Sequence, residues 1–447
     1  MSTSLIKYVW RLFRQKCSTS RVIVTLVAAI VVLQIVHLLM LSRVGNTRGS
    51  RKMPQKSTDS NRARKATSLP VKLSEVGLDS SGNYQVHTFL VASDLIERGT
   101  VMKDDVTIVT QCSPNHLHLL FDQAEIWAGP ISVAIFAPNP NITALYVVIA
   151  HLRHCSLKIQ KFASFHLVYP LRQMSQSRGF NKENYSSRPI EIAMHCTEVK
   201  DWIKNFDNLD HENYVLAGDV PYPNNLLRNV AWQGSVTEYI LVLDIDIIPS
   251  SGLLASFKSF DRRRKSLSLS HLEMEEPPET VYVLPAFEIR EGIDRIFTPM
   301  KKNELLTLWN EGDVRPFYEE VCSKCQIHSS YTRWRTFESE SPDMMNIAYE
   351  LEWKDPWEPF YIAKRHIPKY DERFKQYGFN RISQVCEVHI AGYNFSVMDT
   401  GFVVHKGFKT SAGMQKRFKE NDQNLLLFRL FKEELKTKYE ESMRRCY

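Results

Sequence analysis

The chain has 447 residues, of which 43% are hydrophobic and 24% charged, and its 57 Lys and Arg against 50 Asp and Glu give a formal net charge of +7. This composition excludes a mainly disordered chain, and 17 Gly and 20 Pro are too few for a collagenous protein. Residues 1–75 carry a net charge of +12, whereas the other 372 residues carry a net charge of −5. Because the positive excess lies outside the mildly acidic body, we expect no nucleic acid among the partners.

The first predicted element of the chain is a membrane anchor. Residues 22–42 are 21 residues without a charge, between Arg21 and Arg43. As a helix, they would span roughly 30 Å, the thickness of a bilayer core. A cleaved signal peptide would have a shorter apolar region followed by small residues, so we favour an uncleaved signal anchor. We therefore expect a cytosolic tail at 1–21, a single transmembrane helix at 22–42 and a stem at 43–75.

The stem and the flanks of the anchor leave the orientation open. Residues 43–72 are rich in Ser, Thr, Asn, Lys and Arg and poor in apolar residues, which is typical of a disordered stem. The same composition also fits a polybasic patch on a cytosolic membrane face. Because basic residues stand on both sides of the anchor, counting charges does not favour a lumenal body.

Cysteines and sequons bear on the compartment. In an oxidising lumen, an even subset of the seven cysteines after the anchor would pair and one would stay free. The CxxC motif at 322–325 lacks the second pair or the nearby histidines of a zinc site, so we expect a disulfide role for it. The pairing is open among Cys112, Cys155, Cys196, Cys322, Cys325, Cys386 and Cys446. Sequons at Asn141, Asn184 and Asn394 fit a lumenal body, although each is weak evidence alone.

Strands and helices alternate in the body of the chain. Residues 106–110, 131–136, 165–169 and 239–243 are predicted strands, and residues 114–126, 144–152 and 224–232 are predicted helices. This alternation predicts an α/β domain with a largely parallel sheet, in which ligands bind beyond the carboxyl ends of the strands. Residues 261–280 contain four consecutive basic residues and an acidic, proline-containing end, and we expect them to form an exposed loop.

The strongest chemical signal is the motif Asp244-Ile245-Asp246, which directly follows the apolar strand 240–243. Alternation along a strand would place the two carboxylates on one side. Two such carboxylates can share Mg²⁺ or Mn²⁺, ions that bridge the phosphates of a nucleotide. The alternative is an acidic turn before Pro249. The strand context favours the metal site.

Six blocks of the sequence resemble glycosyltransferase family 49. They lie at 222–229 (YPNNLLRN), 243–250 (LDIDIIPS), 285–290 (PAFEIR), 357–361 (WEPFY), 377–383 (YGFNRIS) and 404–409 (VHKGFK). The resemblance runs from about residue 75 to the C-terminus. It implies a GT-A fold with a mixed, mainly parallel sheet, and a type II Golgi membrane protein whose lumenal catalytic domain spans 76–447.

The same resemblance implies a reaction. The expected donor is UDP-glucuronate and the expected acceptor is a xylose-terminated glycan, joined by an inverting β1,4 transfer during protein O-mannosyl glycan synthesis. The expected cofactor is Mn²⁺, with Mg²⁺ as the alternative. Other Golgi transferases are further expected partners.

Individual residues can be given roles on this basis. His405 is the expected third metal ligand beside Asp244 and Asp246, because enzymes of this fold often take a late His. A cation is also needed for the donor carboxylate, and Arg290, Lys301 and Lys302 are unranked candidates for it. The residues expected to contact the donor are Asn225, Arg228 and Asn229 on the predicted helix, together with Arg290 and Lys406.

Inversion needs a general base that takes the proton of the acceptor hydroxyl. We choose Glu358 first and Asp355 second, because both lie in an aromatic segment where low polarity would raise a carboxyl pKa. Asp371 and Glu372 are rivals. The alternative for the whole segment is a packed aromatic core whose acids cap a loop.

Two other functions stay open from the sequence. One is an N-acetylglucosaminyltransferase or another UDP-sugar transferase of the same fold. The other is a catalytically silent Golgi protein that binds a glycan, against which the intact Asp244–Asp246 motif and His405 argue.

Overall fold

The computed structural model describes Gln34 and residues 75–138, 142–171, 194–206, 220–270, 279–293, 300–339, 344–411 and 418–446. Apart from Gln34, these residues belong to one compact unit, Ala66–Tyr447. The predicted tail, anchor and stem lie outside the described residues except at Gln34 and Glu75, and so do Asn141 and Asn184. Among the helices that are described, none has the length and hydrophobicity needed to cross a membrane.

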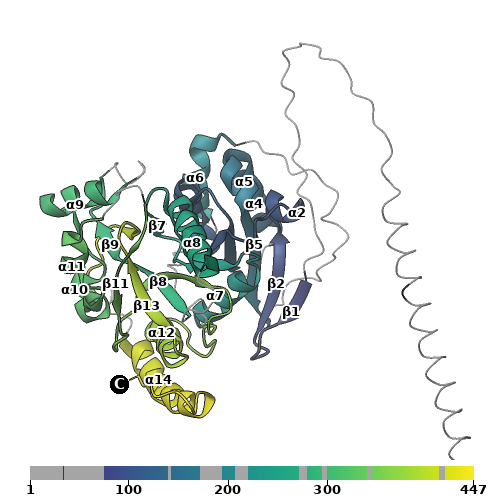
Figure 1. The fold of residues 1–447 in the computed structure, drawn as a ribbon. Coiled ribbons are helices and arrows are strands. Elements are labelled where there is room, and N and C mark those ends of the chain that lie inside the picture. The colour runs from purple at the N-terminus through teal and green to yellow at the C-terminus, as the bar shows by residue number, and fades with distance from the viewer. Residues whose placement is uncertain are drawn as a thin grey trace, which may run out of the picture. The chain divides into compact units, whose positions relative to one another are not determined.

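A ten-stranded sheet forms the centre of the unit (Figure 1). Its strands, in spatial order, are β1 (Glu75–Leu78), β2 (Tyr84–Val91), β5 (Ala163–Pro170), β4 (Ile131–Phe136), β3 (Val106–Cys112), β6 (Tyr239–Val242), β12 (Phe360–Lys364), β8 (Thr280–Leu284), β13 (Asn394–Met398) and β11 (Ile347–Leu351). The four predicted strands correspond to β3, β4, β5 and β6, and these four pair parallel to one another.

The expectation of a mainly parallel sheet is wrong for the sheet as a whole. Five of its nine described pairings are antiparallel, because β1, β2, β12 and β11 return against their neighbours. The strands that follow β6 in the chain are short and lie between irregular segments, so the sequence pattern did not reveal their direction. The sheet is therefore mixed.

Helices cover both faces of the sheet because its strands are apolar on both sides. In β4, Ala134 and Phe136 belong to one hydrophobic cluster, and Val133 and Ile135 belong to the other. The helix α7 (Asn224–Gln233) contributes to the first cluster. The second cluster is completed by η1 (Pro114–Leu119), α3 (Leu120–Trp127), α4 (Ile142–Cys155), α5 (Leu157–Phe162), α6 (Cys196–Lys204) and α8 (Leu253–Ser270).

The predicted exposed loop at 261–280 is wrong for its first half. Residues 261–270 continue α8, and β8 begins at Thr280. Ion pairs one helical turn apart stabilise the helix, since Arg264 and Lys265 both contact the buried carboxylate of Asp261 at 2.9 and 2.8 Å. The four consecutive basic residues therefore belong to a helix and not to a loop.

The remaining helices gather at the other end of the unit, on the side opposite β1 and β2 (Figure 1). They are α9 (Lys302–Glu311), α10 (Glu319–Cys322), η6 (Ser323–Cys325), η7 (Ile327–Ser329) and α11 (Tyr331–Thr336). The short helix α2 (Asp94–Glu97) follows β2, α12 (Asn380–Ile390) precedes β13, and α14 (Phe418–Lys438) lies near the C-terminus.

A second, four-stranded sheet has the order β10 (Val314–Pro316), β9 (Ala286–Ile289), β14 (Val403–Lys406) and β7 (Ile247–Pro249). The strand β7 follows β6 after only four residues, so the chain passes directly from the large sheet to the small one. The Asp244-Ile245-Asp246 motif occupies this connection. The fold thus places the motif at the carboxyl end of β6, where ligands of parallel sheets bind.

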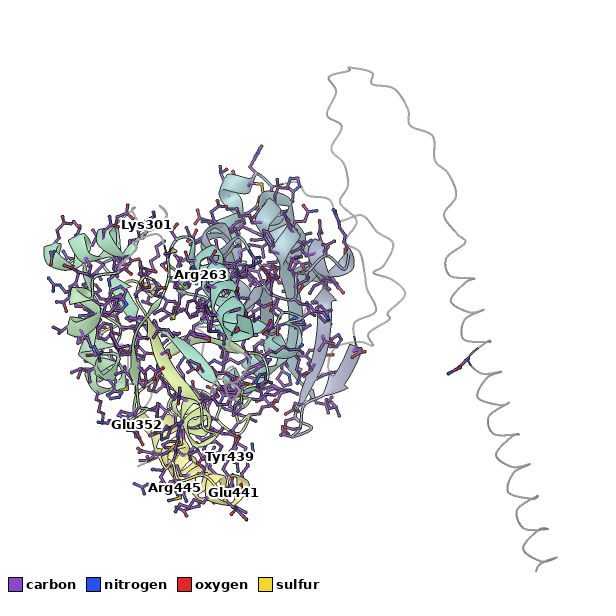
Figure 2. The ribbon with its side chains drawn as sticks, in the orientation of Figure 1. Arg263, Lys301, Glu352, Tyr439, Glu441 and Arg445 are labelled. Carbon is purple, nitrogen blue, oxygen red and sulfur yellow. A yellow bond between two sulfur atoms is a disulfide. The ribbon has the colours of Figure 1, made fainter. Side chains whose placement is uncertain are left out.

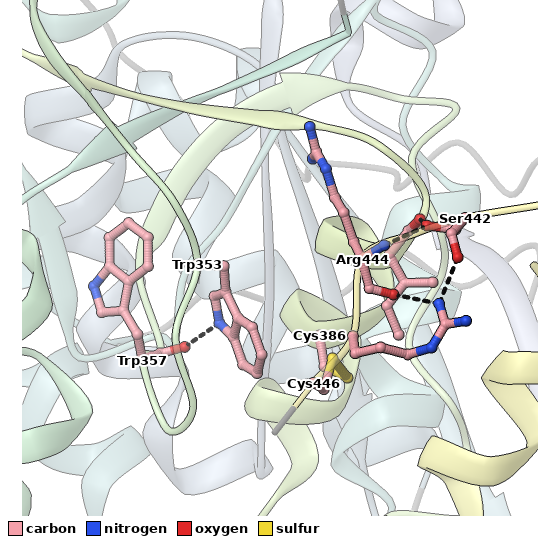
Figure 3. The surroundings of a disulfide bond; sticks show 8 residues. Trp353, Trp357, Cys386, Ser442, Arg444 and Cys446 are labelled. Carbon is pink, nitrogen blue, oxygen red and sulfur yellow. Dashed lines mark hydrogen bonds between the residues drawn. A yellow bond between two sulfur atoms is a disulfide. The ribbon is translucent and has the colours of Figure 1, made fainter.

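Three disulfides confirm the expectation that an even subset of the cysteines pairs. Their partners are Cys155–Cys196, Cys322–Cys325 and Cys386–Cys446, and Cys112 is free and buried. The last disulfide ties α12 to the C-terminal segment, next to the hydrogen bond from Trp353 Nε1 to the Trp357 carbonyl (Figure 3). The covalent link thereby fixes the end of the chain to the helix that begins at the candidate site.

The Cys386–Cys446 disulfide should contribute measurably to stability. It closes a separation of 60 residues, for which the loss of chain entropy predicts about 4 kcal/mol. The double variant Cys386→Ala/Cys446→Ala should lose about this much free energy of unfolding in a chemical denaturation series. The matched control Cys322→Ala/Cys325→Ala removes a separation of 3 residues and should lose only about 2 kcal/mol. Equal losses would contradict the entropic account.

Candidate active site

A cavity of about 1030 Å³ opens at the connection between β6 and β7. It is lined by the Asp motif, by Arg228 of α7, by the first turn of α12 and by the loop that follows β14. Residues from 317–325 and 355–358 also contribute to its lining. Five of the six sequence blocks that carry the family resemblance therefore contribute to a single cavity.

Asp244 joins two buried arginines. Its Oδ1 accepts from Arg228 at 3.0 Å and its Oδ2 accepts from Arg381 at 3.3 Å. Burial acts to lower the pKa of Arg381, but Asp244, Tyr370 and Glu358 together outweigh it and the pKa is raised. An arginine side chain stays protonated in proteins, so Asp244 links α7 to α12 through two charged groups.

The helix α7 is held in place by its asparagines. Asn225 donates to the carbonyls of Asp371 and Asn380, and its own Oδ1 accepts from Arg228 at 3.0 Å. Asn229 donates to the Tyr370 carbonyl at 2.8 Å. Both side chains are buried and neither lines the cavity. Arg228 is thus placed at the cavity as predicted, whereas the two asparagines bind the backbone that supports it.

Asp246 and His405 meet across the small sheet. His405 on β14 pairs with Ile247 on β7, the residue that follows Asp246, and this register brings His405 Nε2 to 3.0 Å from Asp246 Oδ2. His405 Nδ1 contacts the Gly407 carbonyl at 2.7 Å. A carbonyl only accepts, so Nδ1 carries the hydrogen, and a neutral imidazole would point the lone pair of Nε2 at the carboxylate. The contact therefore requires a proton or a cation between the two atoms.

The charges around Asp246 keep it ionised. Burial acts to raise the pKa of this carboxyl, but the charges of His405 and Lys409 and their hydrogen bonds outweigh it, so the pKa is well below its ordinary value. Lys409 Nζ lies 3.4 Å from Asp246 Oδ2. The result is an anionic ligand at the cavity wall, held among positive groups.

The pair fits a divalent metal. A carboxylate with an imidazole whose other nitrogen donates to a backbone carbonyl is the usual setting of a metal-bound His. First-row ions accept this nitrogen and oxygen pair, and substrate phosphates commonly complete such a site. Within the described residues, however, no group of three or more His, Cys, Asp or Glu is close enough to hold a metal. The expected third ligand, Asp244, directs both oxygens to arginines.

Glu358 lines the same cavity as the Asp motif. Its backbone N–H donates to the Cys325 carbonyl at 2.8 Å, and its carbonyl accepts from Gln326 Nε2 at 2.7 Å. Burial raises the pKa of the Glu358 carboxyl to about 7, against the opposing charges of Arg381 and Arg228. Burial also raises the pKa of Asp355, which lines the same cavity. A carboxyl with a pKa near neutrality suits a general base.

The other cations predicted to meet the donor lie elsewhere. Arg290 is exposed and pairs with Asp313 at 3.2 Å. Lys406 Nζ lies 3.9 Å from Asp122, and neither residue lines the cavity.

The two lysines at the start of α9 are also outside the lining. Lys301 stands at the start of α9 (Figure 2), and Lys302 donates to the Phe337 and Asp399 carbonyls. None of these four side chains lines the cavity.

Two further cations line the cavity as neighbours of the Asp motif, Arg381 and Lys409. Sequence reasoning gave Arg381 no role, although its place in the YGFNRIS block was a signal for one. In the structure Asn380, the residue before Arg381, accepts from Arg228 through Oδ1 at 2.9 Å. Only the packing of α12 against α7 brings these residues together.

A known protein family and several known proteins match the sequence of this chain. The family model described as "Glycosyl-transferase for dystroglycan" matches residues 105–440. The chain is 38% identical to "Beta-1,4-glucuronyltransferase 1" of Danio rerio over 97% of this chain and 100% of that protein. The Homo sapiens protein of the same name is 40% identical, over 83% of each chain.

Other proteins match this chain with lower sequence identity. "Xylosyl- and glucuronyltransferase LARGE2s" of Gallus gallus is 26% identical over 72% of this chain and 34% of its own length. Among solved structures, Staphylococcus aureus TarS in complex with UDP covers 68% of this chain and 60% of its own, with 10% identity and a TM-score of 0.28, too low to establish a shared fold. Because the family model covers most of the chain and full-length relatives match it closely, this chain belongs to the dystroglycan glycosyltransferases, glycosyltransferase family 49, and is a glycosyltransferase.

Proposed function

We propose that the chain transfers glucuronate from UDP-glucuronate to a terminal xylose, with inversion to a β1,4 linkage, in protein O-mannosyl glycan synthesis. The observation that carries this proposal is the cavity whose lining joins a metal-competent Asp246–His405 pair to a half-buried carboxyl with a raised pKa, Glu358. The donor and linkage follow the names of the relatives. The domain is proposed to have the GT-A fold.

Each of these site residues has its own role in the proposed reaction. Glu358 takes the proton of the acceptor hydroxyl as that oxygen attacks the anomeric carbon from the face opposite the diphosphate. Asp246 and His405 hold Mn²⁺, with Mg²⁺ as the alternative, and the ion when bound supplies Lewis-acid stabilisation of the diphosphate leaving group. Lys409, at 3.4 Å from Asp246, adds positive charge on the same side. The role of Asp244 as a third ligand stays a prediction, and in the structure it orients Arg228 and Arg381.

We also propose that the chain is a single-pass type II protein of the Golgi membrane. The support is the uncharged segment 22–42, followed by a body, residues 76–447, whose cysteines form three disulfides. Disulfides persist in secretory compartments and are rare in the cytosol. Other Golgi transferases are proposed partners. Protease protection of the body in sealed Golgi vesicles tests this orientation, and digestion of the body without detergent would contradict it.

The donor is tested with the purified segment 76–447. With Mn²⁺ and a β-xyloside, it should transfer glucuronate from UDP-glucuronate and should use UDP-N-acetylglucosamine, UDP-glucose and UDP-xylose poorly. Product linkage is read by NMR. Preference for UDP-N-acetylglucosamine would replace the proposed function by the second transferase, and no metal-dependent binding of any UDP-sugar would favour a silent glycan-binding protein.

The metal pair is tested by Asp246→Asn. This variant keeps the size of the side chain but removes the anionic ligand, so Mn²⁺-dependent binding of UDP should be lost and turnover should fall by about 10³-fold or more. Calorimetric titration of UDP with and without Mn²⁺ measures the binding. Asp104→Asn is the matched control, because Asp104 pairs with Arg262 outside the cavity lining, and it should bind UDP normally. Unchanged metal dependence in Asp246→Asn would refute the assignment.

The base is tested by pH dependence. Glu358 works as a carboxylate, and its pKa of about 7 means that the active form is lost as the pH falls through 7. We expect kcat/KM to fall about tenfold per pH unit below 7 and to level off above it. Glu358→Gln should abolish this fall of kcat/KM below pH 7 and should lower kcat by about 10²- to 10⁴-fold. Asp355→Asn should retain the fall of kcat/KM below pH 7. If that variant loses the fall instead, Asp355 is the general base.

A further inference from the structure

We propose that Arg381 binds the C6 carboxylate of the donor sugar and so makes the enzyme select a uronate over the neutral hexose. This inference rests on the proposed function, because it concerns the donor of that reaction. It replaces the three cations expected from the sequence, Arg290, Lys301 and Lys302, which lie outside the cavity.

The setting of Arg381 fixes its guanidinium. The residue lies in the first turn of α12, and one nitrogen, Nη2, donates to Asp244 Oδ2 at 3.3 Å. The guanidinium lies over the ring of Phe360, with its central carbon 4.2 Å from the ring centroid. An ion pair on one nitrogen and an aromatic ring against one face hold the plane of the group in a single orientation.

The rest of this guanidinium faces the cavity. Arg381 is a lining residue, and its Nε and Nη1 have no hydrogen-bond partner within the described residues. Neither nitrogen is among the fully enclosed polar atoms that lack a partner, so both can be reached from the cavity. These N–H groups are the donors with which a guanidinium receives a carboxylate.

The charges at the cavity floor favour an anion there. Arg228 and Arg381 are both buried, at 2% and 7% exposure, and both form an ion pair with Asp244. Arg381 meets Asp244 through Nη2 only, so an incoming carboxylate can form further charge-assisted hydrogen bonds with its other nitrogens. A hydroxymethyl group at the same position would form only weaker, neutral hydrogen bonds with them.

The other cations of the cavity are less suited to this task. Lys409 contacts Asp246 on the side of the proposed metal. Arg228 already donates to Asn225, Asn380 and Asp244. Lys324 and Arg429 are exposed, so their charges are solvated and discriminate weakly between a charged and a neutral sugar. Lys432 is half-buried and its Nζ lies 5.2 Å from the centroid of the Phe428 ring, so its ammonium group is not held in a fixed plane. Arg381 is the lining cation that combines burial with donors directed at the cavity.

The experiment compares UDP-glucuronate with UDP-glucose, which differ only in having a carboxylate or a hydroxymethyl group at C6. Turnover and binding of both donors are measured for the 76–447 segment and for Arg381→Gln, Arg381→Lys and Arg228→Gln. Arg381→Gln should lower kcat/KM for UDP-glucuronate by about 10²-fold or more, as expected for lost charge-assisted hydrogen bonds, and should lower it for UDP-glucose by less than about tenfold. Arg381→Lys should recover part of the preference for UDP-glucuronate.

The Arg228→Gln variant is the matched control, because it also removes a guanidinium from Asp244. It should lower the use of both donors with their ratio kept within about threefold, as expected for a positioning role. Thermal unfolding shows whether each variant is folded. If Arg381→Gln does not fold, Arg381→Lys provides the test. A preserved donor ratio in folded Arg381→Gln or Arg381→Lys would overturn the proposal.

The binding measurements separate this proposal from the proposed function. If the unaltered protein transfers no glucuronate but binds UDP-glucuronate more tightly than UDP-glucose, and Arg381→Gln abolishes that difference, the reaction assignment fails and the carboxylate site stands. If the unaltered protein shows no preference for UDP-glucuronate in either binding or turnover, the carboxylate site is refuted.

Discussion

The ion pairs of Asp244 with two buried arginines are the interaction on which the candidate site depends. Arg228 comes from α7 and Arg381 from α12, and 152 residues separate them in the chain. One carboxylate at the end of β6 therefore fixes two helices and the turn that leads to Asp246. Since breaking a buried pair leaves an uncompensated charge, the arrangement is held firmly once the helices are packed.

The small sheet positions His405 and Lys409 beside Asp246. Its strands β7 and β14 are short, but their register is set by burial on both sides, with Ile247, Val403 and Val404 all buried. That register places His405 beside Asp246 and leaves Lys409 at the cavity. Glu288 on the neighbouring β9 is fully buried and accepts from the backbone N–H of Lys409 at 3.1 Å, so the loop after β14 is fastened as well.

The two carboxylates of the motif consequently have different surroundings. Asp244 faces guanidinium groups that stay charged, whereas Asp246 faces an imidazole and an ammonium group at the cavity wall. The sequence argument treated them as equivalent because residues i and i+2 of a strand share a side. In the structure they lie in the turn between β6 and β7, where alternation no longer applies, and their neighbours decide their chemistry.

The sequence by itself determined the parallel strands β3 to β6, the helices beside them, the motif after β6 and the family resemblance. It also predicted Asp246, His405 and Glu358 as site residues, and these three line one cavity. These follow from local patterns and short blocks that do not depend on distant contacts. It misjudged the start of 261–280, where ion pairs along α8 favour helix, and the direction of the later strands. Only the tertiary structure decided that Asn225 and Asn229 support a backbone, that Arg290 and Lys406 lie away from the cavity, and that Arg381 lies within it. The reason is physical: a cation gains its role from the carboxylates and rings packed around it, and the partners of Arg381 are Asp244, 137 residues away in the chain, and Phe360 of a different element.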